Sequence, residues 1–243
     1  MMRAEGISKA FGSLQVLDGL DLALRPGRVT AIVGPNGSGK TTLIKCLLGL
    51  VRRDGGEIYL NGELVGNSAT YRQDIGYMPQ IARMPENLTG AELIAMLKDL
   101  RGIRDEELDE ELVDLFDLEP HLRKPLGTLS GGTRQKVNAV CAFMFRPRLL
   151  VLDEATAGLD PVASGILKDK VLRERSFGRT VVITSHIVSE LEELADDVAF
   201  LLEGRVRFTG SVAQLVAATG QTRLERAIAR LMMRGGAALE VVQ

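Results

Sequence analysis

Eight consecutive residues near the start of the chain have the types and spacing of a phosphate-binding loop. They fill the pattern G-x-x-x-x-G-K-[ST], and in order they are Gly34, Pro35, Asn36, Gly37, Ser38, Gly39, Lys40 and Thr41. Glycines let the backbone curl so that its N–H groups point at phosphate oxygens. Lys40 then places a cation on the β- and γ-phosphates, and the Thr41 hydroxyl can ligate a metal. The loop therefore predicts a site for a nucleoside triphosphate with Mg²⁺.

The segments on either side of this loop are those that such a loop requires. Residues 28–33 contain β-branched side chains that predict a strand, and residues 42–49 predict an apolar helix. The positive end of that helix, which begins at Thr42, would face the phosphates. The alternative is a glycine turn that binds nothing, and the order of strand, loop and helix argues against it.

Two adjacent carboxylates, Asp153 and Glu154, follow an apolar run at residues 149–152 that predicts a buried strand. In a parallel α/β sheet, ligands bind at the carboxyl ends of the strands. We expect Asp153 to hold Mg²⁺ there through water, and Glu154 to act as general base for the water that attacks the γ-phosphate. Each acid could instead cap a helix or lie in a turn, an alternative that a phosphate loop in the same chain disfavours.

Residues 129–135 predict a second anion site. Ser130 can cap a helix, and Gly131 and Gly132 leave backbone N–H groups uncovered at its start. If both anion sites bound the same nucleotide within one chain, one of the two would be redundant. We therefore expect two chains to lie head to tail, so that the phosphate loop of each faces the Ser130–Gly132 segment of the other across the nucleotide. An ordinary capped helix after a glycine-rich loop is the alternative.

The hydrophobic pattern predicts the elements that hold these motifs. The first third is β-rich, with a hairpin signal at Asn61-Gly62, and its strands are expected at residues 16–24, 57–60, 63–65 and 75–80. A helical block follows, opened by a capping box at Thr89, with helices expected at residues 89–101, 105–117 and 131–145. The last third alternates strands and helices at residues 149–152, 161–175, 180–184 and 188–195, then closes with a hairpin of 199–202 and 205–208.

These elements predict an α/β fold of the P-loop NTPase type, with a mixed sheet, an N-terminal antiparallel β subdomain and an inserted helical subdomain. Residues 1–243 are expected to form one domain. Its parts are a RecA-like core with the antiparallel β subdomain at 1–81 and 148–215, a helical subdomain at 82–147 and a C-terminal helical tail at 216–243. The tail is expected to pack on the core through Leu224, Ile228, Leu231 and Met232.

Composition argues against several classes of protein. The chain has 243 residues, of which 45% are hydrophobic, and a formal net charge of -2. This charge gives no bulk attraction to an anionic membrane or to nucleic acid, which we do not expect as a partner. No apolar run approaches the roughly eighteen residues that span a bilayer, and the N-terminus has no signal-peptide core, so a cytoplasmic protein is predicted. Cys46 and Cys141 are expected to be buried and reduced.

Together, these motifs resemble the nucleotide-binding subunit of ATP-binding-cassette (ABC) systems, over roughly residues 1–215. Phe11 lies where that family has an aromatic residue that stacks on adenine, and Gln80 where it has a glutamine that senses Mg²⁺ and touches the membrane partner. Residues 129–135 are similar to the family's signature sequence, and residues 157–160 to the loop that crosses the dimer interface. His186 matches the histidine that contacts the γ-phosphate.

The resemblance implies an ATPase that works as a homodimer around ATP and Mg²⁺. The residues that it assigns to phosphates and metal are Gly39, Lys40, Thr41, Thr42, Gln80 and Asp153, of which Thr41, Gln80 and Asp153 form the metal shell. Glu154 and His186 would organise the attacking water, while Ser130 and Gly132 would stabilise the γ-phosphate from the second chain. Three residues depart from the family pattern without removing a reactive group, namely Thr133 for glutamine, Ala155 for proline and Phe11 for tyrosine.

The resemblance also implies a membrane partner. The chain would be peripheral on the inner face of the cytoplasmic membrane, and it would contact the membrane only through a separate permease subunit. Candidate apolar contacts are Met78, Ile81, Met84 and Pro85, which local core packing would explain nearly as well. Residues 77–88 and Thr133 are similar to ATPases of exporter-type or Nos-type copper-handling systems, which predicts a role in copper handling for nitrous-oxide reductase maturation.

Two other classes of protein remain as alternatives. A soluble, non-transport ABC ATPase would act in regulation, in translation or on DNA, but such proteins usually carry a long coiled-coil insertion or two cassettes. A P-loop kinase needs an acceptor site, whereas this chain has the Ser130–Gly132 segment and Glu154 after Asp153. Co-purification with a membrane protein would separate these alternatives from a transport subunit.

Overall fold

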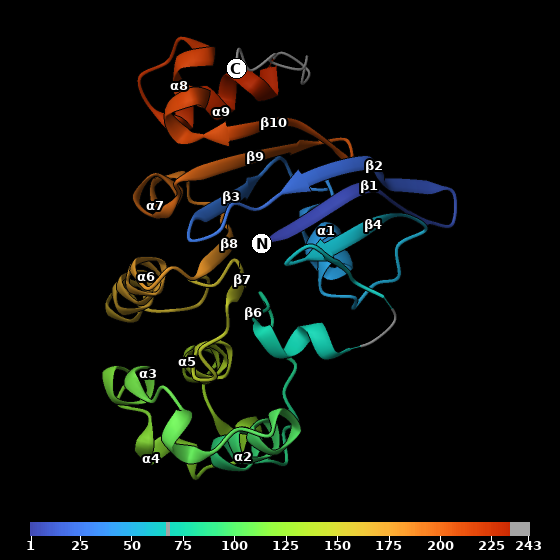
Figure 1. Cartoon of the computed structure of the whole chain (residues 1–243). Helices are drawn as coiled ribbons and strands as arrows, with labels where there is room; N and C mark the ends of the chain where they lie inside the picture. The colour runs from blue at the N-terminus through green and yellow to red at the C-terminus, as the bar shows by residue number, and fades with distance from the viewer. Residues whose placement is uncertain (67–68, 234–243) are drawn as a thin grey trace.

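The computed structural model describes residues 1–66 and 69–233, and a six-stranded sheet forms its centre (Figure 1). The strand order is β10-β9-β3-β8-β7-β6, with β3 Val29–Val33, β6 Ile75–Met78, β7 Leu149–Asp153, β8 Thr180–Thr184, β9 Asp197–Leu202 and β10 Arg205–Ser211. All neighbours run parallel except β10, which is antiparallel to β9. Every residue of β3, β7 and β8 is buried, which is typical of strands covered on both faces. The predicted mixed sheet is confirmed.

A second sheet is antiparallel and lies beside the first (Figure 1). Its strand order is β2-β1-β4-β5, with β1 Met2–Phe11, β2 Leu14–Ala23, β4 Gly55–Leu60 and β5 Glu63–Leu64. The predicted hairpin turn joins β4 to β5, and its residues Asn61 and Gly62 have the positive φ values, 54° and 89°, that a tight turn requires. The helix after the phosphate loop, α1 (Lys40–Leu47), joins the two sheets in one core cluster, where each fully buried aliphatic side chain contributes about 1.5–3 kcal/mol.

The helical block lies between β6 and β7 in sequence and occupies the end of the molecule drawn at the bottom of Figure 1. Its elements are α2 Gly90–Arg101, η2 Asp105–Glu107, α3 Glu111–Leu115, α4 Glu119–Leu122, η3 Leu126–Thr128 and α5 Gly131–Phe143, and the short η1 Thr70–Asp74 precedes β6. The capping box at Thr89 is confirmed, because its hydroxyl accepts the Glu92 N–H at 3.2 Å and its own N–H donates to the Glu92 carboxylate at 2.8 Å. Ser130 caps α5 as expected.

The helix predicted over residues 105–117 is wrong, since η2 and α3 are separated there by extended backbone at Leu108. The Asp109 N–H donates to the Met144 carbonyl at 2.8 Å, at the end of α5, instead of continuing a helix. The Asp109 carboxylate accepts the Lys170 ammonium at 2.6 Å. Contacts with α5 and α6 therefore override the local helical spacing.

The described part of the last third, up to residue 233, contains four helices, namely α6 Pro161–Ser176, α7 Val188–Leu194, α8 Val212–Thr219 and α9 Leu224–Met233. In α9, Leu224, Ile228 and Leu231 are buried as predicted, but Met232 is 41% exposed and lies outside this buried face. The helical tail expected from residue 216 begins earlier, because α8 starts at Val212, and residues 234–243 lie outside the described residues. The division of the chain into domain parts stays a prediction.

Among the described residues, no helix is both long and apolar enough to cross a bilayer. The two thiols are free, with Cys46 buried and Cys141 half-buried. Burial raises the pKa of both thiols, and that of Cys141 to about 12. Both cysteines are therefore protonated at neutral pH and serve as packing groups.

Candidate functional site

The phosphate loop connects β3 to α1 and leaves its backbone exposed to a cavity. Gly37 and Gly39 have φ values of 79° and 105°, which favour glycine. Gly34 is required for another reason, because a Cβ there would lie 2.1 Å from the Leu201 carbonyl oxygen. The Lys40 ammonium donates to the carbonyl oxygens of Gly34 and Pro35 at 2.8 and 3.1 Å. The loop is thus folded in the curled form that the pattern predicts.

Lys40 makes no ion pair among the described residues, although two carboxylates lie near it. Burial lowers the pKa of the Lys40 ammonium, and the charges of Glu154 and Asp153 oppose that effect. A partly desolvated cation held by loop carbonyls is a ready partner for an anion such as a phosphate. The buried Ser38 hydroxyl in the same loop has no hydrogen-bond partner within the described protein.

The carboxyl end of β7 supplies the two acids predicted there. Asp153 is buried, with 3% exposure, and accepts the Thr184 hydroxyl from β8 at 2.6 Å. Glu154 has a φ of 51°, and its N–H lies 3.1 Å from the Thr184 carbonyl oxygen and 3.0 Å from the Thr184 hydroxyl. Thr184 therefore fixes both acids, a role that the sequence analysis missed. The sequence signal that could have identified Thr184 is its position as a polar residue at the carboxyl end of a predicted strand.

Two other predicted site residues, Gln80 and His186, meet at the Glu154 carboxylate. Gln80, just after β6, donates from Nε2 to Glu154 Oε2 at 2.7 Å. His186, just after β8, places Nε2 2.6 Å from Glu154 Oε1. The imidazole side chain is 53% exposed, whereas the Glu154 side chain is 15% exposed. A half-exposed histidine against a carboxylate at a sheet edge can hold or pass a proton.

These side chains and the phosphate loop line one open cavity of about 420 Å³, formed by Leu14, Val16, Asn36, Gly37, Gly39, Lys40, Thr41, Thr42, Gln80, Glu154 and His186. The predicted adenine contact, Phe11, is not among these lining residues. Phe11 is 51% exposed, and the Lys9 ammonium lies 5.2 Å from its ring centroid. Leu14 and Val16 of β2 are the apolar residues that reach the cavity, and nothing in their local sequence signalled this.

The signature segment lies outside this cavity in the single chain. The Ser130 hydroxyl accepts the Thr133 N–H at 3.1 Å and bonds the Thr133 hydroxyl at 2.8 Å, so Thr133 supports the cap. Gly132 lies against the loop at residues 157–160, since a Cβ on Gly132 would meet the Gly158 carbonyl at 3.3 Å. Ser130, Gly131 and Gly132 are therefore not brought to the phosphate loop of their own chain.

The lining groups, together with the buried Ser38 of the same loop and the buried Asp153 next to Glu154, fit a nucleoside triphosphate with Mg²⁺. The unpartnered Ser38 hydroxyl, the Lys40 ammonium and the glycine backbone suit phosphate oxygens. Thr41, Gln80 and Asp153 offer only oxygen ligands of the kind that Mg²⁺ prefers, and proteins usually hold this ion by one or two carboxylates together with phosphate oxygens.

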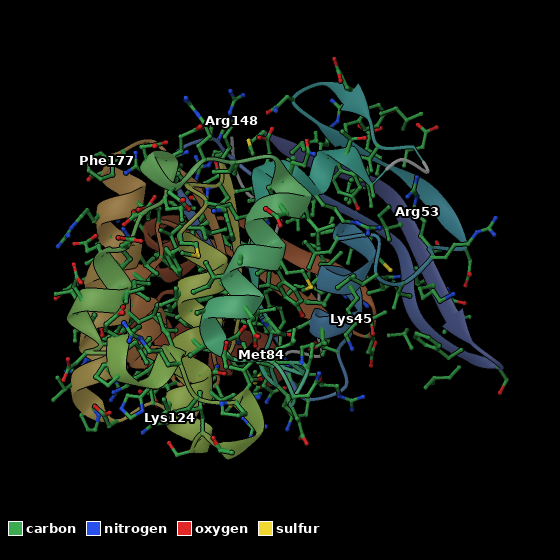
Figure 2. The ribbon with its side chains drawn as sticks, turned by 90° about the horizontal axis from the view of Figure 1, so that it is seen from below. Lys45, Arg53, Met84, Lys124, Arg148 and Phe177 are labelled. Carbon is green, nitrogen blue, oxygen red and sulfur yellow. The ribbon has the colours of Figure 1, made fainter. Side chains whose placement is uncertain are left out.

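The predicted apolar contacts around Gln80 divide into exposed and buried residues. Met78 is 0% exposed within β6, so its prediction as a partner contact is wrong. Ile81 is 71% exposed and Pro85 is exposed, whereas Met84 is half-buried against the core. Met84 lies on the face of the molecule seen in Figure 2. Met78 pairs with Leu152 of β7, and its side chain belongs to the buried core cluster.

Known proteins resemble this chain over most of its length. Residues 17–157 match the ABC transporter family. The chain is 36% identical over 225 residues to the daunorubicin resistance ATP-binding protein DrrA3 of Streptomyces coeruleorubidus, which covers 91% of this chain and 71% of that protein. It is 31% identical over 224 residues to the linearmycin resistance ATP-binding protein LnrL of Bacillus subtilis. The alignment covers 90% of this chain and 72% of that protein. With the human phospholipid-transporting ATPase ABCA3 it shares 35% identity over 206 residues, which are 83% of this chain and 12% of that protein.

Solved structures share the fold. One described as the ATP-binding subunit of an ABC transporter matches with a TM-score of 0.90 and 28% identity, covering 96% of this chain and 99% of that one. A dimeric ATP-binding cassette with bound ADP and Pi matches in fold, with a TM-score of 0.77 and 22% identity over 87% and 98% of the two chains. The predicted P-loop NTPase fold is confirmed. The phosphate loop and the acids after β7 lie within the matched segment, and the chain therefore belongs to the ABC transporter family as an ATP-binding cassette.

Proposed function

We propose that this chain is the ATP-hydrolysing subunit of an ABC exporter, in which two copies close on ATP and drive a separate membrane subunit. The proposal of ATP hydrolysis depends mainly on one observation. Both Gln80 and His186 contact the Glu154 carboxylate beside the phosphate loop. Export is favoured because the relatives DrrA3 and LnrL are named for drug resistance, and a further relative, 30% identical over 220 residues, for Nod factor export.

Each part of the site has a role in this proposal. The loop backbone, Lys40 and Thr42 bind the phosphates, while Thr41, Asp153 and Gln80 would hold Mg²⁺. When bound, this ion supplies charge neutralisation on the phosphate oxygens. Glu154 accepts the proton of the attacking water, and His186 orients the Glu154 carboxylate through its 2.6 Å contact. Positioning and charge stabilisation give most of the rate gain, because phosphoryl transfer needs little covalent chemistry from the protein.

The second chain supplies the signature segment. Ser130, Gly131 and Gly132 lie at the start of α5, where backbone N–H groups and the helix dipole favour an anion. They do not line the nucleotide cavity of their own chain, and solved cassettes of this fold are described as dimeric. A twofold pair would bury two nucleotides between self-complementary faces. Phe11 keeps its proposed place beside adenine, with Leu14 and Val16 as neighbouring apolar contacts.

The proposed membrane subunit contacts the surface around Gln80 through Ile81, Met84 and Pro85. Movement of that segment reaches the reacting groups directly, because Gln80 bonds Glu154. The chain would then lie in the cytoplasm, against the inner face of the membrane. Copper handling for nitrous-oxide reductase maturation stays a narrower prediction that depends on residues 77–88 and Thr133. A regulatory, translation or DNA-associated ATPase stays the alternative from another class.

The Glu154→Gln variant tests the proposal. It keeps the phosphate loop and therefore binds ATP, but it loses the proton acceptor, so the rate of ATP hydrolysis should fall at least about a hundredfold. Because bound ATP is then not consumed, the variant should elute as a dimer on size exclusion with ATP and Mg²⁺, and as a monomer without them. Steady-state phosphate release and the elution volume are the two measurements.

Lys40→Ala is the matched control, since it should lose ATP binding as well as the ATP-dependent dimer. Wild-type turnover in Glu154→Gln would remove Glu154 from the role of base. Absence of ATP hydrolysis by the wild-type chain, alone and with a co-purified membrane subunit, would contradict the proposed function as a whole.

A further inference from the structure

One carboxylate oxygen joins the two loops that carry the reacting side chains. Glu190, in the first turn of α7, accepts the Thr156 hydroxyl at 2.9 Å and the Ser185 hydroxyl at 2.8 Å, both through Oε2. Thr156 lies in the loop after β7, two residues beyond Glu154. Ser185 lies in the loop after β8, directly before His186. Glu190 itself does not line the nucleotide cavity.

Each hydroxyl that Glu190 binds lies in a tight turn that holds a residue proposed to react. The Ser185 hydroxyl accepts the Ile187 N–H at 3.0 Å, which closes the backbone around His186. In the other loop, the Ala157 N–H donates to the Glu154 carbonyl at 3.0 Å. Fixing Thr156 and Ser185 to one oxygen therefore fixes two tight turns relative to each other.

Charge pairing does not explain this arrangement. Within the part of the chain that the structure describes, Glu190 makes no ion pair, and the nearby Lys168 ammonium pairs with Glu193 at 2.6 Å. A small cavity of about 20 Å³ lies beneath Glu190, with Leu152, Leu167, Val171 and Ile183 in its lining. Thr156, Ser185 and Lys168 also line this cavity, and both hydrogen bonds to Glu190 are partly buried, so water competes for them less than at the surface.

We propose that Glu190 is a positioning residue that keeps the His186 ring and the Glu154 carboxylate in contact by holding both loops on one oxygen. The His186 side chain is 53% exposed, so packing against neighbouring side chains holds the ring only in part. The effect of this inference on kcat rests on the proposed ATP hydrolysis. The position of the His186 ring, however, can be measured without ATP turnover.

The ring signals of His186 in an NMR spectrum give that measurement. The chain contains two histidines, so the variant His186→Ala assigns the signals of His186 and His121. Glu190→Ala should shift the His186 ring signals and leave those of His121 in place. Glu190→Gln keeps an oxygen that accepts both hydroxyls, and should restore the wild-type spectrum. Glu193→Ala, on the same helix, is the matched control and should change neither histidine's shift.

Hydrolysis kinetics give the second measurement. A small misplacement of reacting groups costs much rate, so Glu190→Ala should lower kcat at least about tenfold, with ATP affinity within about twofold of wild type. In a His186→Ala background the same substitution should have no further effect on kcat, because Glu190 acts through His186. Glu190→Gln and Glu193→Ala should both keep kcat near that of wild type.

Several outcomes would overturn the positioning role. Unchanged His186 signals in Glu190→Ala would do so, as would an equal loss of kcat with and without His186. If Glu190→Ala shifts the signals of both histidines, Ser185→Ala tests the positioning role instead. This variant removes one of the two hydroxyls without opening the core, so it must shift the signals of His186 alone. A wild-type chain that binds ATP without hydrolysing it would refute the proposed function, while the histidine signals would still decide this inference.

Discussion

At the scale of single residues, the backbone at Glu154 shows how the site is assembled. Its φ of 51° lies in the left-handed region, which costs a non-glycine residue roughly 1–2 kcal/mol. The two contacts of its N–H with Thr184, at 3.1 and 3.0 Å, offset that cost. Ala155, which stands where the family usually has proline, is buried in the same turn. The departure therefore leaves the contacts of Glu154 with Gln80 and His186 intact.

Asp197 gives a pH-dependent prediction at this scale. Burial alone raises the pKa of its carboxyl, but hydrogen bonds from the Arg28 and Arg25 guanidiniums outweigh burial and hold that pKa below its usual range. A carboxyl with a lowered pKa in the folded state stabilises the fold above its unfolded pKa of about 3.9, and this stabilisation is lost as the pH falls below that value.

Asp197→Asn should therefore lower the free energy of unfolding by about 1–3 kcal/mol at pH 7, and the difference from wild type should shrink towards pH 3. Urea unfolding at several pH values measures it. Asp99→Asn, at an exposed position on α2, is the control and should change little at any pH. A difference that stays constant down to pH 3 would contradict the role of the Asp197 charge.

At the scale of elements, a buried charge network joins the helical block to α6. The Lys170 side chain is 2% exposed, and its ammonium lies 2.6 Å from Asp109, 2.8 Å from Glu111 and 3.0 Å from Glu174. Arg173 also pairs with Glu111. Asp109 and Glu111 precede and begin α3, so this network fixes the chain where a continuous helix was predicted.

Lys170→Met tests that network. It removes the cation and leaves three carboxylates close together, so the free energy of unfolding should fall by about 3–5 kcal/mol. Lys168→Met is the matched control, since it breaks only the pair with the 46%-exposed Glu193 and should cost at most about 1 kcal/mol. Chemical denaturation of both variants gives the comparison. Equal stability of Lys170→Met and wild type would show that the network does not hold the helical block.

At the scale of the whole molecule, the nucleotide cavity and the signature segment belong to different surfaces of one chain. The cavity is lined by the phosphate loop, Gln80, Glu154 and His186, whereas Ser130 lies at the start of α5 in the helical block. Lys136 in α5 pairs with Asp160, at the start of α6, at 3.3 Å. The signature helix and the loop at 157–160 are thereby linked, so the face that carries both would move as one body.

Mixing two inactive variants tests the head-to-tail dimer. Lys40→Ala lacks a working phosphate loop, and Gly132→Asp places a negative charge in the signature segment, so each alone should have little ATPase activity. In a mixed dimer, one site combines the intact phosphate loop of one chain with the intact signature of the other. Equal mixing should thus restore a fraction of wild-type activity, at most about half, because each mixed dimer has one complete site of two.

Phosphate release after mixing measures this recovery. Each variant alone, at the total protein concentration of the mixture, is the control and should stay inactive. If both variants fold and form mixed dimers with ATP but the mixture hydrolyses no ATP, the two halves of the site do not come from different chains.

Much of the fold was predictable because its signals are local. β-Branched side chains indicated β3, and continuous apolar runs indicated β7 and β8. Asn61-Gly62 indicated a hairpin, and Thr89 with Glu92 indicated a capping box, and the structure contains both. The errors occur where distant residues meet. Pairing with β7 buries Met78, and α5 and α6 break the helix expected at 105–117.

The sequence by itself determined which groups are proposed to react and the order of the elements that carry them. The phosphate loop, the acids at the end of an apolar strand and a capped glycine pair are all patterns of neighbouring residues. Only the tertiary structure decided which groups touch. Gln80 and Glu154 are 74 positions apart, and Thr156 and Glu190 are 34 apart, yet each pair shares a hydrogen bond. Such contacts depend on the packing of strands and helices around one sheet edge, which no local pattern of side chains encodes.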